Sequence, residues 1–169
     1  SLVGSEMCIR DRFMEKVVLP TVAFVGRLFP NLTVQGLGDP NYAYSLLKQY
    51  KGEWEFDTNW KMIFGHPKKA GWIKAIQEAQ QTVQKGLKLD CPILVMSSNK
   101  SFPETETWHE EYMTSDIVLD VQDIQKYGEK LGDKVTRDTI PNGIHDLILS
   151  QKPYRNDAYQ TIFEWLKKQ

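Results

Sequence analysis

Residues 116–145 decide the fold expected of this chain, and they read D-I-V-L-D-V-Q-D-I-Q-K-Y-G-E-K-L-G-D-K-V-T-R-D-T-I-P-N-G-I-H. An acid, Asp116, opens the stretch, and the apolar pattern that follows predicts an amphipathic helix over 121–131 and a strand over 134–140. His145 comes next, after a Pro-Asn-Gly turn. Open α/β sheets collect functional groups where parallel strands end, so this order predicts a carboxylate and an imidazole at one edge of a parallel sheet.

A helix and a strand are expected directly before this stretch. Residues 70–87 repeat apolar side chains every three or four positions, which is typical of an amphipathic helix. Residues 91–97, C-P-I-L-V-M-S, form the continuous apolar run of a parallel strand buried on both faces. A last amphipathic helix is expected over 154–168. The pattern predicts the α/β class, with a parallel sheet and helical crossovers, for residues 70–169.

Residues 13–69 predict a helical, cap-like insert before this core. Helical spacing is seen over 13–29 and 42–50, and residues 30–41 are rich in turn formers. Residues 52–67 are rich in aromatic side chains, for which two interpretations stay open. One is that these side chains line the mouth of a site, and the other is that they anchor the insert to the core. The aromatic residues concerned are Trp54, Phe56, Trp60 and Phe64.

The first twelve residues, S-L-V-G-S-E-M-C-I-R-D-R, resemble translated sequencing-adapter read-through. We therefore exclude residues 1–12 from fold reasoning. On this interpretation Cys8 has no biological role and the natural protein continues upstream. The alternative is a genuine, irregular N-terminal extension.

Composition restricts the classes of partner. The 169 residues suit one domain, and 21 basic residues balance 22 acidic ones, so no nucleic acid or anionic membrane is indicated and a small-molecule substrate is expected. Cys8 and Cys91 lack metal-site spacing, and there is no phosphate-binding glycine loop, so we expect no cofactor and no metal. No apolar run approaches the roughly 20 residues of a membrane span, so we expect a soluble, cytoplasmic protein. The oligomeric state is open.

His145 is the strongest candidate for a catalytic group. It lies in G-I-H-D-L-I-L-S, after a flexible turn. An imidazole at such a position can take a proton and return it, because its pKa lies near neutral pH. The alternative is an incidental turn histidine. His66 and His109 have no comparable setting, and we expect them to be structural or exposed.

The chain resembles α/β-hydrolases of the serine aminopeptidase and lysophospholipase type. The resemblance runs from residue 13 to the C-terminus and rests on G-E-W-x-F, G-W-I-K-A-I, C-P-I-L-V-M-S-S, S-D-I-V-L-D-V and H-D-L-I-L-S. It implies the cap and C-terminal half of such an enzyme, an esterase or amidase with a triad ordered Ser, acid, His along the chain. His145 would be its general base.

The same resemblance selects the acid. The family places it before one residue and two apolar residues, and D-I-V-L at 116–119 fits, so Asp116 is the expected triad acid. Asp120 and Asp123 then fall at the start of a helix, where carboxylates cap free N–H groups. The departure from the family is an insertion of 18 residues, 98–115, between strand and acid, and it keeps Asp120 open as the alternative.

A nucleophile is missing. There is no G-x-S-x-G, and none of the eight serines has glycines two positions before and two after. The backbone donors of an oxyanion hole would also lie upstream. We therefore expect a fragment of a serine hydrolase that carries the acid and base of the triad and is inactive alone. The alternative is a non-catalytic binding or scaffolding module on an α/β-hydrolase frame.

Overall fold

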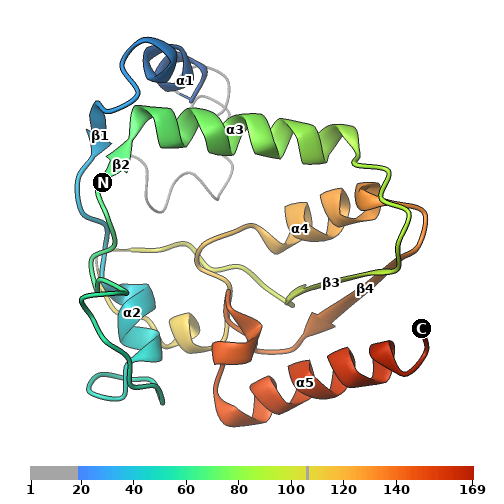
Figure 1. The fold of residues 1–169 in the computed structure, drawn as a ribbon. Helices are drawn as coiled ribbons and strands as arrows, with labels where there is room; N and C mark the ends of the chain where they lie inside the picture. The colour runs from blue at the N-terminus through green and yellow to red at the C-terminus, as the bar shows by residue number, and fades with distance from the viewer. Residues whose placement is uncertain (1–18, 106) are drawn as a thin grey trace.

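The computed structural model describes residues 19–105 and 107–169, and Figure 1 shows how the elements are arranged. In chain order the elements are α1 (Leu19–Leu28), β1 (Thr33–Gln35), α2 (Asn41–Leu46), β2 (Lys68–Lys69), α3 (Ala70–Lys85), β3 (Ile93–Ser98), α4 (Val121–Gly128), β4 (Val135–Ile140) and α5 (Lys152–Leu166). Short 3-10 turns lie at Glu110–Met113, Glu129–Leu131 and Leu147–Leu149. Within the described ranges, no helix is long and apolar enough to cross a membrane.

The centre of the fold is a parallel pair, β3 and β4, whose register runs from Ile93 opposite Val135 to Ser98 opposite Ile140. Helix α4 connects the two strands, and in Figure 1 it lies above them while α5 lies below. The indole Nε1 of Trp165 in α5 donates to Thr136 Oγ1 of β4 at 3.2 Å. The predicted α/β class, with a parallel sheet and a helical crossover, is confirmed.

Local sequence signals explain where the crossover begins and ends. Asp120 caps α4, because its carboxylate accepts a hydrogen bond from Gln122 N at 2.8 Å. The predicted helix 121–131 consists of α4 and the 3-10 turn Glu129–Leu131 after it. Helix α5 begins at Lys152, two residues earlier than predicted, because Pro153 is compatible with the first turn of a helix.

The strands are less buried than the sequence predicts. The first four residues of β3 are partly exposed, and only its last two, Ser97 and Ser98, are buried. Four of the six residues in β4 are exposed. Burial on both faces requires neighbouring strands and helices on each side, and in the described part of the chain this sheet consists of β3 and β4 alone.

Residues 19–69 contain a small sheet that periodicity does not predict. Strands β1 and β2 pair antiparallel, with Thr33 opposite Lys69, and this brings the chain to the start of α3. Elements of three and two residues are too short to show an alternating pattern. Helix α1 packs on α3 closely enough that a Cβ at Gly26 would lie 2.4 Å from the Ala70 carbonyl oxygen. Residues 13–18 of the predicted helix, and the read-through candidate 1–12 with Cys8, lie outside the described residues.

Of the aromatic residues of 52–67, Trp54 anchors the region to the core, while Trp60 and Phe64 are exposed. Trp54 anchors the region to the core, because its Nε1 donates to the Leu149 carbonyl at 2.7 Å and the Arg155 guanidinium lies 4.6 Å from its ring centre. Trp60 is 86% exposed and does not anchor anything in this structure. Phe64 is also exposed.

The contact between α4 and β3 can be tested at Gly128. A Cβ there would lie 2.8 Å from Val95 Cγ1, and valine is stiff about χ1, so Gly128→Ala should strain the contact by about 1–3 kcal/mol. The better helix propensity of alanine offsets up to about 1 kcal/mol of this strain. The free energy of unfolding, measured by urea titration, should therefore fall by roughly 1 kcal/mol.

The matched control is Gly36→Ala, since a Cβ at Gly36 meets nothing within 4 Å. It should change the free energy of unfolding by less than about 0.5 kcal/mol. A Gly128→Ala protein as stable as the Gly36→Ala protein would contradict the packing of α4 on β3.

Candidate active site

The insertion between β3 and Asp116 forms a loop whose two ends are joined by backbone hydrogen bonds. Asp116 N donates to the Lys100 carbonyl at 3.0 Å, and Phe102 N donates to the Asp116 carbonyl at 3.0 Å. The chain therefore returns beside residues that directly follow the end of β3. Because the loop closes on itself, the acid occupies the carboxyl end of the strand in spite of the insertion's length.

The carboxylate of Asp116 is held by three donors. Its side chain is buried, with the residue 1% exposed. Oδ1 accepts hydrogen bonds from the backbone N–H groups of Val118 and Leu119, both at 2.8 Å. Oδ2 lies 3.0 Å from His145 Nδ1. The structure thus brings the two residues proposed from the sequence within hydrogen-bonding distance.

His145 is held by the turn that follows β4. Asn142 adopts a positive φ of 58°, a conformation that asparagine tolerates, and its N–H donates to Asn99 Oδ1 at 3.0 Å. This bond ties the turn to the residue after β3. Farther along, Ile144 N donates to Ser150 Oγ at 3.0 Å. The imidazole is therefore presented by a loop with fixed bonds on both sides of it.

The pKa of His145 is raised by its surroundings. Burial alone lowers it, but the hydrogen bond and the negative charge of Asp116 raise it, and so does the charge of Asp146. Lys61 opposes this with a smaller lowering effect. The carboxylates outweigh burial, so the protonated imidazole is stabilised at this position.

The other sequence candidates lie elsewhere. The Asp120 carboxylate accepts from Gln122 N at the start of α4, and Asp123 lies in the first turn of that helix. His66 is exposed. His109 packs in the insertion, with its ring centre 5.3 Å from that of Phe102. Asp116 is thus the acid that the structure places beside His145.

Three further residues at this site carried no recognised signal in the sequence. Tyr42 Oη donates to Asp146 Oδ2 at 2.6 Å, and Asp146 N donates back to Tyr42 Oη at 3.2 Å. Lys61 Nζ lies 3.8 Å from the same Oδ2. Asp146 could have been noted as the neighbour of His145, but Tyr42 is 104 positions away and no local pattern indicates the contact.

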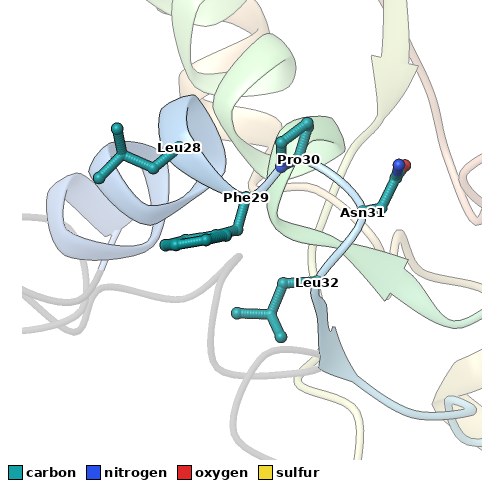
Figure 2. Close-up of a pocket in the computed structure, with 5 residues that line it drawn as sticks. All are labelled: Leu28, Phe29, Pro30, Asn31 and Leu32. Carbon is teal, nitrogen blue, oxygen red and sulfur yellow. The ribbon is translucent and has the colours of Figure 1, made fainter.

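Two hollows of the described surface lie away from the Asp116–His145 pair. Figure 2 shows one of about 430 Å³, lined by Leu28, Phe29, Pro30, Asn31 and Leu32 at the end of α1. A second, of about 360 Å³, lies between the parallel strands and α5 and is lined in part by Leu94, Thr136 and Trp165. Neither is lined by Asp116 or His145. In the described ranges no group of His, Cys, Asp and Glu is arranged to hold a metal ion.

Comparison with known proteins supports the fold. The sequence matches no protein-family model and no curated protein. A soluble variant of monoglyceride lipase from Saccharomyces cerevisiae, solved in complex with a substrate analog, is similar over 92% of this chain and 50% of its own, with 13% identity and a TM-score of 0.57. The monoacylglycerol lipase of Paleococcus ferrophilus is similar over 94% of this chain and 54% of its own, with 12% identity and a TM-score of 0.58.

The chain shares its fold with the matching part of these two lipases. It spans about half the length of each of these two lipases. Structural similarity at such low sequence identity shows a common architecture. The activity has to be argued from the residues themselves.

The Asp116–His145 bond predicts a pH-dependent stability. A raised pKa means that the folded state binds a proton more tightly than the unfolded state does, so the contribution is complete below the ordinary histidine pKa of 6.5 and is lost as pH rises through the raised value. His145→Ala should therefore lower the free energy of unfolding by about 1–3 kcal/mol at pH 5 and by less at pH 9, measured by denaturant titration.

His66→Ala is the control, since His66 is exposed. Its effect should be small and the same at both pH values. A His145→Ala deficit that does not change between pH 5 and pH 9 would show that no charged imidazole is stabilised beside Asp116.

Proposed function

We propose that this chain supplies the acid and the base of a serine hydrolase that cleaves carboxylic esters or amides, of the lysophospholipase or serine aminopeptidase type. The observation that carries the proposal is the 3.0 Å contact between Asp116 and His145. The two residues follow neighbouring parallel strands, and the acid is buried with two backbone N–H donors on its other oxygen. An acid held in this way can orient an imidazole and stabilise its protonated form.

Each group has a defined part in the reaction. Asp116 accepts from Nδ1–H, which leaves His145 Nε2 free to accept the proton of a serine hydroxyl as that oxygen attacks the substrate carbonyl. The imidazolium is stabilised by the carboxylate and then gives the proton to the leaving alcohol or amine. A water molecule, deprotonated by the same nitrogen, attacks the acyl-enzyme, which releases the acid and returns the proton to the serine.

The serine is proposed to come from outside the 169 residues. Ser97 and Ser98 are the serines at the carboxyl end of β3, but both are buried. Ser97 Oγ donates to the Ser98 carbonyl at 2.9 Å and accepts from Gln125 Nε2 at 2.8 Å, so its bonds tie the strand to α4. We propose residues 70–169 as the C-terminal half of the core and residues 13–69 as the cap-like insert over it.

The substrate is proposed to be a small ester or amide. Exposed aromatic and apolar side chains of residues 52–67, Trp60 and Phe64 among them, are available to contact an apolar acyl group in the whole protein. One structural neighbour, the yeast lipase, was solved with a substrate analog.

The test is to obtain the coding sequence upstream of residue 13, express the full reading frame and assay nitrophenyl and monoacylglycerol esters. We expect a G-x-S-x-G upstream of β3, and activity that His145→Ala reduces by up to roughly 10⁶-fold. His66→Ala should leave turnover unchanged. The 169-residue chain should not exceed an imidazole control, because it lacks the nucleophile and oxyanion hole.

Two results would overturn the proposal. One is ester turnover by the full protein that survives His145→Ala. The other is a full reading frame without a serine elbow that binds esters and leaves them intact, which would establish the binding module instead.

A further inference from the structure

A second layer of contacts surrounds His145, and it comes from the region before the core. Tyr42 lies in α2, and its hydroxyl is bonded twice to Asp146, once to the carboxylate at 2.6 Å and once to the backbone N–H at 3.2 Å. Asp146 directly follows His145 in the chain. Two bonds to one residue fix its backbone as well as its side chain, so Tyr42 restrains the peptide that carries the imidazole.

The tyrosine ring also meets the imidazole directly. The two ring centres are 6.1 Å apart and the planes are 74° from parallel, an edge-to-face arrangement. Burial and the neighbouring Asp146 raise the pKa of Tyr42 far above its ordinary value. Its hydroxyl therefore keeps its proton and remains a donor at every pH at which a histidine can act as a base.

Lys61 adds a charge to the same contact. Its Nζ lies 3.8 Å from Asp146 Oδ2 and 5.3 Å from the ring centre of Tyr42. The charged groups acting on His145 are thus Asp116 and Asp146, which favour the imidazolium, and Lys61, which opposes it. Lys61 belongs to the same cap-like region as Tyr42, so this region acts on both the position and the proton affinity of the imidazole.

The region is itself firmly attached. Asn41 Nδ2, at the start of α2, donates to the Thr105 carbonyl of the insertion at 2.9 Å. At the other end of the helix, Leu46 is fully buried and its carbonyl accepts from Trp54 N at 2.8 Å. Trp54 in turn donates to Leu149, four residues past His145. Tyr42 is therefore held relative to the histidine loop from both sides.

We propose that Tyr42 is a positioning residue for His145, acting through Asp146, and that Lys61 sets the balance of charge around the imidazole. The part of Tyr42 in catalysis rests on the proposed function: in the full enzyme, Tyr42→Phe would lower kcat with little change in KM. The contact itself can be tested on the 169-residue chain without any turnover, so the inference and the hydrolase proposal can fail separately.

The first experiment compares Tyr42→Phe with Tyr44→Phe by proton NMR of the imidazole Nδ1–H. Tyr44 is the matched control, since it lies in the same helix and its ring contacts a different residue, Tyr50, with the two ring centres 4.0 Å apart. Tyr42→Phe should speed exchange of the Nδ1 proton with water roughly tenfold, the change expected for a lost contact of about 1.4 kcal/mol. Tyr44→Phe should not change it.

If Tyr42→Phe does not fold, Asp146→Ala removes the same 2.6 Å bond from the half-exposed partner. It should accelerate the exchange at least as much, because it also removes a negative charge that stabilises the imidazolium. An unchanged exchange rate in whichever of the two folds would overturn the positioning role.

The second experiment measures the pKa of each histidine by deuterium exchange at imidazole Cε1, read by peptide mass spectrometry. Lys61→Gln should raise the pKa of His145, because it removes the opposing cation. Lys48→Gln is the control, since Lys48 pairs with Glu55 in the same region. A pKa of His145 that is equal in the two variants would overturn the role of Lys61.

Discussion

The arrangement of this protein depends on the Asp116 carboxylate, a group that is almost completely removed from solvent. An unpaired buried ion costs several kcal/mol, so such a group persists only where donors surround it. Two of its donors are the N–H groups of Val118 and Leu119, which set the path of the chain into α4. The third is His145, which sets the position of the loop after β4. One ion thus constrains the loops that leave both parallel strands.

The insertion before Asp116 shows how that constraint is met. Its core is Tyr112, which is fully buried, with its ring centre 5.7 Å from that of Phe102 and 5.4 Å from that of Trp108. The Tyr112 hydroxyl accepts from Thr105 N at 2.8 Å. The insertion therefore packs on its own aromatic cluster and returns the chain to the end of β3. The acid therefore lies beside the residues that follow β3, although the chain makes a long loop before reaching it.

The sequence predicts the structural features that depend on local or periodic signals. Helix α3 has a long apolar repeat, Asp120 is recognisable as a helix cap, and the order of strand, helix and strand determines that Asp116 and His145 emerge at one edge. The sequence does not predict β1 and β2, which are too short to show alternation, or the contact of Tyr42 with Asp146. That contact depends on tertiary packing between distant segments, and nothing in the local sequence encodes it.

The most direct measurement of the central claim is the tautomer of His145, obtained from the ¹⁵N chemical shifts of its ring nitrogens at a pH above its pKa. The hydrogen bond that one nitrogen makes determines which nitrogen carries the proton. A bond from Nδ1 to the Asp116 carboxylate predicts a protonated Nδ1 and an unprotonated Nε2. A ring that is protonated mainly at Nε2 would contradict the account, because neither the stabilised carboxylate nor a base directed at a nucleophile would then be present.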